Sequence, residues 1–174
     1  GIGIADDIIT YGSNELEHDK NFITLCETAR VNGLSLNAKK LQFKSKDCKF
    51  FGHRLTPEGL KADSDKIEAI TKMEAPTNET ELKSFLGMVN YLGRYCGTLA
   101  HVRAPLDQLS KKSSAWRWDP EQELAFQTIK TLITRLPVLA YFDEKLQHSI
   151  QCDASKKGLG AVLLQEGQPV IYIS

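Results

Sequence analysis

Two adjacent carboxylates, Asp6 and Asp7, interrupt an apolar run at the start of the chain. Isoleucines on both sides of the pair favour a pleated, half-buried strand, and Gly12 then breaks it. Two like charges inside such a strand cost free energy unless a water-exposed turn or a bound cation compensates them. The pattern therefore predicts either the tip of a hairpin or a metal-binding strand–turn–strand.

After this run the pattern changes from helix to strands and then to a loop. Asn14 is a candidate N-cap with a glutamate three residues later, apolar residues follow at helical spacing, and Gly33 can end the helix. Residues 34–55 alternate well enough for two short strands with a polar turn at residues 44–47. We expect residues 56–66, TPEGLKADSDK, to form a loop.

Helical periodicity dominates the middle of the chain. Asn78 can cap one helix, whose apolar stripe covers residues 82–92. Asp119 followed by Pro120 is a strong start signal for another helix. The patterns predict helices at residues 63–75, 78–95, 99–109 and 119–136.

Strand signals return near the C-terminus. Three strands, at residues 148–155, 158–165 and 169–174, are predicted to form a hairpin meander with a turn at residues 166–168. Because both ends of the chain cut through predicted strands, we expect the chain to be a piece of a longer polypeptide.

Composition narrows the class of protein. The 174 residues are 41% hydrophobic and 25% charged, which is typical of a soluble globular protein. No apolar run approaches the roughly 20 residues that span a bilayer, so no membrane partner is expected. The four cysteines are scattered without zinc-site spacing, and this favours a reduced, intracellular compartment.

The charge is unevenly distributed although its sum is zero. Zero net charge argues against a simple nucleic-acid-coating protein. Residues 38–54 nevertheless carry five lysines and Arg54 against Asp47, interleaved with three phenylalanines. This run is either a solvated face or a strand pair that presents cations to a phosphate backbone.

Eight segments of the chain, in the same order, resemble the reverse transcriptase–ribonuclease H polyprotein of Ty3/gypsy-type retrotransposons. They are IADDI, GLSLNAKKLQF, FFGHRLTPEGLKADSDKIEAI, ELKSFLGMVNYLGRY, APLDQLSKK, WRWDPEQELAFQTIK, PVLAYFD and QCDASKKGLGAVLLQ. The resemblance implies an α+β chain in three parts. These are the C-terminal part of a palm (residues 1–60), a helical thumb (61–115), and a linker helix with the N-terminal β-meander of an RNase H-like domain (116–174).

The resemblance implies a role for the first carboxylates. Asp6 and Asp7 match the hairpin that holds two Mg²⁺ ions for nucleotidyl transfer, for which a further aspartate comes from an earlier strand that this chain lacks. Ile4 stands where the family usually has Tyr, which puts the contact with the primer end in doubt. Lys40 aligns with a lysine that protonates the departing pyrophosphate, or it is a surface lysine.

Contacts with nucleic acid are also implied. Phe51, Gly52 and His53, preceded by Phe50, match the hairpin that grips the primer, although the two phenylalanines alone would suggest core positions. Lys39 and Lys49, in the basic run before this element, are further candidates for contact with nucleic acid. The thumb offers further cations for phosphate contact, each of which is otherwise a solvated side chain: Lys83, Arg94, Arg103, Lys111 and Lys112. Trp116 and Trp118 are expected to pack the thumb against the next domain.

A second catalytic carboxylate is implied near the C-terminus. Asp153 matches the first metal-binding aspartate of the RNase H-like fold, at the open end of its central strand, with Ile150 and Cys152 facing the core. The alternative is a strand-end aspartate that caps the turn at residues 155–157. The other RNase H carboxylates of the family follow residue 174.

The resemblance thus implies an RNA-directed DNA polymerase with ribonuclease H activity as the parent protein. Its partners would be an RNA/DNA or DNA template–primer duplex, deoxynucleotide triphosphates and the rest of the Pol polyprotein. The expected location is intracellular: the cytoplasm, a virus-like particle or the nucleus. We expect this chain alone to be inactive. The alternatives are a non-catalytic nucleic-acid-binding remnant and a non-functional truncated gene product.

Overall fold

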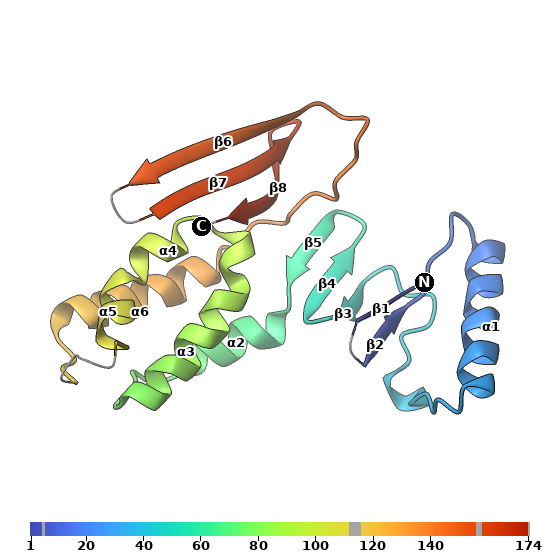
Figure 1. Ribbon diagram of the computed structural model, residues 1–174, viewed down its shortest axis with the longest axis horizontal. Coiled ribbons are helices and arrows are strands. Elements are labelled where there is room, and N and C mark those ends of the chain that lie inside the picture. Colours follow the sequence, from blue (N-terminus) through green and yellow to red (C-terminus); the bar gives the residue numbers. More distant parts are fainter. Residues whose placement is uncertain (5, 112–115, 156–157, 174) are drawn as a thin grey trace. The chain divides into compact units, whose positions relative to one another are not determined.

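The computed structural model describes residues 1–4, 6–111, 116–155 and 158–173 (Figure 1). The α-helices are α1 (Glu15–Val31), α2 (Ser64–Lys72), α3 (Glu79–Leu92), α4 (Leu99–Val102), α5 (Ala104–Leu109) and α6 (Pro120–Ile133), and the 3₁₀ turns are η1 (Ala38–Lys40) and η2 (Gly93–Tyr95). The strands are β1 (Ile2–Ile4), β2 (Asp7–Ile9), β3 (Cys48–Phe50), β4 (His53–Thr56), β5 (Gly59–Ala62), β6 (His148–Ser155), β7 (Gly158–Gln165) and β8 (Gln168–Ile173).

The chain forms two compact units, residues 1–55 and 56–174. The three-part division at residues 60 and 115 stays a prediction. Among the described residues, no helix has the length and apolar character that a membrane span requires.

The first unit begins with the predicted hairpin. Strands β1 and β2 are antiparallel, with Ile4 opposite Asp7, so the carboxylate pair lies at the turn. Asn14 caps α1 by accepting from the backbone N–H of Glu17 at 2.9 Å. The Glu17 carboxylate accepts in return from the N–H of Ser13 at 2.7 Å. Gly33 follows the helix with φ +69°, and the predicted boundaries of α1 are confirmed.

The prediction of two strands over residues 34–55 with a turn at 44–47 is wrong in its first half. In place of the first strand, Asn37 caps η1 by accepting from the N–H of Lys39 at 3.0 Å. Such local side-chain bonds to the backbone compete with strand pairing. The strands that pair are β3 and β4, and their turn is Phe51-Gly52.

A short strand in the second unit was predicted as a loop. Strand β5 occupies Gly59–Ala62, and Leu60 exchanges two backbone hydrogen bonds with Leu139, at 2.8 and 2.9 Å. The expectation of a loop over residues 56–66 is therefore wrong, because the partner of this strand lies far away in the sequence.

Helices α2 and α3 of the second unit begin at polar caps, as predicted. Asp63 caps α2 and Asn78 caps α3, each accepting from a backbone N–H of the first turn. The predicted helix at residues 99–109 is divided into α4 and α5 at Arg103, just before Pro105. Proline lacks the N–H that would continue the hydrogen-bond ladder, but it is tolerated in the first turn of a new helix.

One apolar core holds the helices of the second unit together. Phe85 of α3 packs on Phe126 of α6 with ring centroids 4.8 Å apart, and every member of the predicted α3 stripe is buried. Trp118 packs edge-on against Phe126 and donates its indole N–H to Glu123 at 2.8 Å. Trp116 stacks on Trp118 and is 36% exposed.

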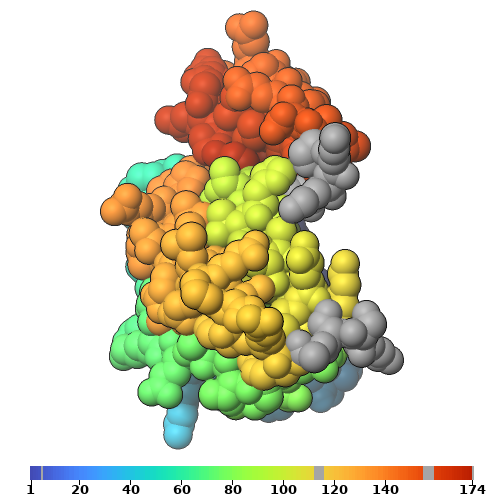
Figure 2. Space-filling model, turned by 90° about the vertical axis from the view of Figure 1, so that its left-hand side faces the viewer, coloured from blue at the N-terminus to red at the C-terminus, as the bar shows by residue number. Residues whose placement is uncertain are grey.

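The C-terminal strands form the predicted antiparallel meander, in the order β6–β7–β8. Tyr172 of β8 packs on the helical core, and β8 lies against η2. Figure 2 shows the meander (red) next to the yellow-green part of the helical region. Ile150 is 69% exposed and Cys152 is exposed as well. The expectation that both face the core is wrong, because they lie on the face of the sheet opposite Tyr172.

Candidate functional site

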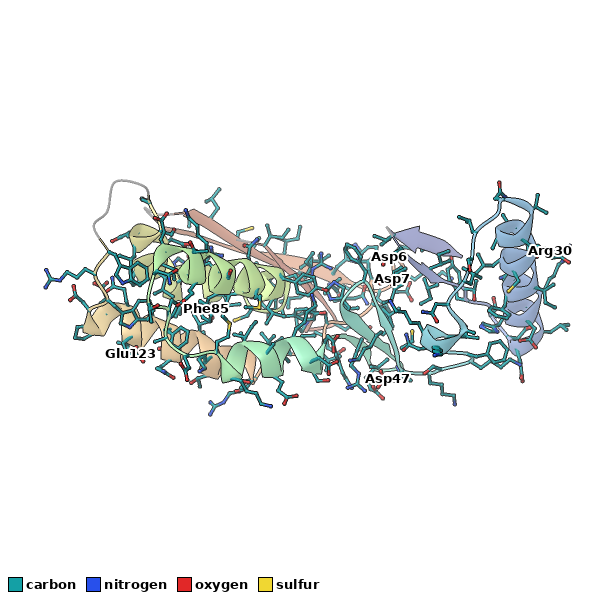
Figure 3. The ribbon with its side chains drawn as sticks, turned by 90° about the horizontal axis from the view of Figure 1, so that it is seen from below. Asp6, Asp7, Arg30, Asp47, Phe85 and Glu123 are labelled. Carbon is teal, nitrogen blue, oxygen red and sulfur yellow. The ribbon has the colours of Figure 1, made fainter. Side chains whose placement is uncertain are left out.

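The carboxylate pair lies exposed at the β1–β2 turn, where Figure 3 labels both side chains. Asp7 Oδ2 accepts from the backbone N–H of Phe51 at 3.0 Å. Among the described residues, no group of three His, Cys, Asp or Glu side chains could hold a metal ion. Two carboxylates nevertheless fit Mg²⁺, which proteins commonly bind through one or two carboxylates together with substrate phosphates.

The Phe51-Gly52 turn lies beside this pair, as the hydrogen bond to Asp7 requires. Phe51 is 47% exposed, and both turn residues have positive φ, +47° and +74°. His53, also predicted to contact nucleic acid, is 6% exposed and lies opposite Phe50 in the β3–β4 ladder. Phe51 thus has an accessible side chain, whereas His53 lies inside the fold.

Part of the predicted basic run is used in ion pairs. Lys44 binds Glu15 and Asp19 of α1, and the bond to Glu15 raises the pKa of Lys44 most. The hydrogen bond from Lys44 is also what most lowers the pKa of Asp19. Arg54 forms a bidentate ion pair with Asp47, in which Nε donates to Oδ1 at 3.0 Å and Nη2 donates to Oδ2 at 2.5 Å. The pairs of Lys44 connect the loop before β3 to α1, and the pair of Arg54 connects that loop to β4.

Other cations of the run are more accessible. Lys39 and Lys40 lie exposed on η1 and form no ion pair within the described parts of the chain. Lys49 is exposed on β3, where its backbone N–H and C=O bond the side chain of Gln42 at 2.8 and 3.0 Å. The first unit therefore exposes three cations of the run, Lys39, Lys40 and Lys49.

The thumb cations differ in their surroundings. Arg94 and Lys111 are exposed. Lys83 pairs with Glu79 one turn earlier in α3. Arg103 donates to both oxygens of Asp107 and to Asn90 Oδ1 at 3.2 Å, so it connects α5 with α3. Lys112 lies outside the described residues.

Asp153 is exposed on β6, opposite Gly160 of β7. Since β7 is the middle strand of the three described, β6 is an edge of this meander and not its centre. These three strands do not include the whole sheet of an RNase H-like domain, so the placement of Asp153 on its central strand stays a prediction. It belongs to no group of metal-binding side chains among the described residues.

A second set of polar contacts could not be predicted from the sequence. Residues 139–143, here called the strap, join the helices to the meander. Tyr141 Oη donates to the carbonyl of Thr56 at 3.0 Å. Gln165, 5% exposed, donates to the Tyr141 carbonyl at 3.1 Å and accepts from the Asp143 N–H at 2.8 Å. Neither side chain belongs to a recognisable local pattern, because each partner is distant in sequence.

Comparison with known proteins places this geometry in a class. Residues 118–174 match the family described as the RNase H-like domain found in reverse transcriptase. The Tf2-3 and Tf2-7 transposon polyproteins of Schizosaccharomyces pombe are each 32% identical to this chain over 161 residues, which is 92% of the chain and 12% of each polyprotein.

Solved structures give the same fold. The foamy viral protease-reverse transcriptase in complex with RNA/DNA hybrid matches 93% of this chain and 23% of its own, with a TM-score of 0.82 and 20% identity. Its dRH form in complex with ds DNA matches 94% of this chain and 30% of its own, with a TM-score of 0.80 and 20% identity.

The fold is therefore that of the palm end, thumb and first RNase H-like strands of a reverse transcriptase. The chain is similar over most of its length to polyproteins of Ty3/gypsy-type retrotransposons, and it spans 12% of the length of the Tf2 polyproteins that it matches.

Proposed function

We propose that this chain supplies palm, thumb and RNase H elements to an RNA-directed DNA polymerase with ribonuclease H activity. The observation that carries the proposal is the exposed Asp6-Asp7 hairpin, which is hydrogen-bonded to the Phe51-Gly52 turn in a chain with the reverse transcriptase fold. In this function the first hairpin holds metal and the second positions the primer end.

Nucleotidyl transfer is the proposed chemistry of the palm. Asp6 and Asp7 would hold Mg²⁺, which would supply charge stabilisation for nucleotidyl transfer from a deoxynucleotide triphosphate to a primer 3′-oxygen. When bound, a pair of such ions stabilises the charge on the attacking and leaving oxygens. Lys40, exposed on η1, would give a proton to the departing pyrophosphate. Asp153 would serve the separate ribonuclease H site, again with Mg²⁺.

The proposed partner is an RNA/DNA or DNA template–primer duplex. The foamy viral relatives were solved in complex with RNA/DNA hybrid and with double-stranded DNA, and this supports a duplex here. Lys39 and Lys49 in the first unit and Arg94 in the second would contact phosphates. Phosphate contacts position a protein without reading the sequence, which suits a polymerase that accepts any template.

The rest of the Pol polyprotein completes the proposed enzyme. Both reactions need further carboxylates, so we propose that this chain alone catalyses neither. Its proposed location is inside the cell, in the cytoplasm, a virus-like particle or the nucleus.

Primer extension on oligo(dT)/poly(rA) tests the catalytic part. With Mg²⁺ and dTTP, the isolated chain is expected to give no product above a no-protein blank. A matched reaction with an intact reverse transcriptase checks the substrates. Mg²⁺-dependent extension by the chain itself, lost in Asp7→Asn, would contradict the proposed inactivity.

A nucleic-acid-binding remnant is the second candidate, and the exposed lysines of η1 favour it. The chain should bind an RNA/DNA hybrid more weakly as salt rises, because phosphate contacts release counterions. The triple variant Lys39→Glu, Lys40→Glu, Lys49→Glu should lose this binding. Lys72→Glu, whose lysine pairs with Glu68 on α2, is the control.

If the isolated chain does not bind an RNA/DNA hybrid at low salt, the result would contradict both candidate functions, the polymerase part and the nucleic-acid-binding remnant. A truncated product without function would then remain, and a chain that unfolds without a cooperative transition would support it.

A further inference from the structure

The turn between β3 and β4 has an unusual residue at its first position. Phe51 and Gly52 have φ of +47° and +74°, which is the pattern of a two-residue hairpin turn with both central residues in the left-handed region. Glycine adopts this region at little cost, but a bulky side chain such as Phe rarely does. Some interaction outside the turn must therefore favour this conformation.

Asp7 provides one such interaction. Its Oδ2 accepts from the Phe51 N–H at 3.0 Å across 44 residues of sequence. A hydrogen bond to a carboxylate is stronger than one between neutral groups. Within the described chain, Asp7 Oδ1 and the whole carboxylate of Asp6 accept no hydrogen bond. One oxygen of Asp7 is thus held by the second hairpin, while the other three oxygens of the pair stay available.

We propose that the Phe51 N–H is a positioning group for Asp7. It fixes the orientation of the carboxylate so that Oδ1 faces the same open side as Asp6, ready for a divalent cation. The same bond sets the spacing between the metal-holding hairpin and the primer-gripping turn. This inference rests on the proposed function, which supplies the reason for the cation and the primer.

Amide hydrogen exchange on the ¹⁵N-labelled chain tests the hydrogen bond. In Asp7→Ala the Phe51 amide should exchange about 10- to 100-fold faster, as expected when a bond to a charged group is lost. Asp6→Ala is the matched control and should leave this amide protected. Protected amides of α1 report that the fold survives in both variants. Equal exchange of Phe51 in Asp7→Ala and in the unaltered chain would overturn the proposal.

A Mg²⁺ titration tests whether the hydrogen bond from the Phe51 N–H positions Asp7 for a cation or only stabilises the fold. Gly52→Val keeps both carboxylates, but a β-branched residue cannot adopt the turn, so the Phe51 N–H should leave Asp7. Mg²⁺ binding is followed by the carboxyl ¹³C chemical shifts of Asp6 and Asp7. The Mg²⁺ concentration at the midpoint of this titration should rise about 10-fold or more, which is the usual effect of losing a group that orients a metal ligand. Phe51→Asn keeps the N–H and tolerates positive φ, so its titration should match that of the unaltered chain.

Two results would overturn the positioning role. One is an unaltered chain whose Asp6 and Asp7 signals do not respond to Mg²⁺. The other is a Gly52→Val titration equal to that of the unaltered chain. Failure to bind an RNA/DNA hybrid would count against the proposed function instead, and it leaves both the exchange and the Mg²⁺ readouts interpretable.

Discussion

At the residue scale, Gly59 has a positive φ and lies in close contact with a neighbouring backbone. Its φ is +137°, a value that residues with a Cβ rarely adopt. A Cβ at this position would lie 2.2 Å from the carbonyl oxygen of Leu139. Since Leu60 pairs with Leu139 through two backbone bonds, Gly59 permits the approach of the strap to β5.

Gly59→Ala is therefore expected to destabilise the second unit by about 2–4 kcal/mol, from strained φ and the clash with backbone. Urea unfolding measures the change through the transition midpoint. Gly87→Ala is the control, because Gly87 lies exposed inside α3 and, apart from the adjacent backbone of that helix, no atom lies within 4 Å of the added Cβ. That control should stabilise the chain by about 0.5–1 kcal/mol. An unchanged midpoint in Gly59→Ala would contradict this account of the strap.

Residue-level chemistry was predictable from sequence where its partners are local. The caps Asn14 and Asn78 bond amides three residues away, so a short window contains the whole interaction. Arg103 was a candidate for phosphate contact, but its pairs with Asp107 and Asn90 depend on how α3 and α5 pack. The link from Asp7 to Phe51 is likewise invisible to any local pattern.

At the scale of elements, α3 begins with a network that holds one carboxylate in its charged form. The backbone N–H of Thr77 donates to Glu81 at 2.8 Å and lowers the pKa of Glu81, and the Thr77 hydroxyl adds a second bond at 3.0 Å. Asn78 closes the cap from the other side. The first turn of α3 is thus stabilised by the charged form of Glu81.

The sign of the pH dependence follows from that lowered pKa. A carboxyl with a folded pKa below its unfolded value of 4.5 contributes stability above pH 4.5, which is lost as the pH falls through the folded pKa. The chain should therefore be more stable than Glu81→Gln at pH 6, and the difference should shrink towards pH 3 in urea unfolding. Glu144→Gln removes an exposed charge elsewhere as the control. A difference between Glu81→Gln and the unaltered chain that is independent of pH would contradict the role of the charge.

Helices and strands differed in how far sequence predicted them. The amphipathic stripe of α3 and the start of α6 were predictable because helical bonds and caps are local. Strand β5 was missed because its partner Leu139 is distant, whereas η1 replaced a predicted strand because Asn37 satisfies a backbone N–H locally. Alternation alone does not reveal whether a pairing partner exists.

For the second unit as a whole, the meander presents an apolar face on the side opposite Tyr172. Strand register places Ile150 beside Leu163, Ala154 beside Leu159, and Ala161 beside Ile173 on this face. Within the described chain, Ile150, Leu159 and Ile173 are 69%, 78% and 61% exposed. Exposed apolar patches of this kind promote association of protein surfaces.

Replacing two of these residues should reduce the self-association of the chain without unfolding it. We expect the double variant Ile150→Thr, Leu159→Thr to bind less of a hydrophobic dye and to sediment as a smaller species at high protein concentration. Its unfolding midpoint should stay nearly constant, because the replaced side chains are exposed and Thr favours strands.

The control is Leu16→Thr on α1, a single side chain that is 83% exposed and lies outside the meander. A reducing agent keeps the exposed Cys152, which lies on the same face, from forming disulfide-linked dimers. Equal dye binding and equal sedimentation in the double variant and the unaltered chain would show that this face does not drive association. A loss of dye binding and of the larger sedimenting species in the double variant alone would instead show that the apolar β6–β8 face drives association of the chain.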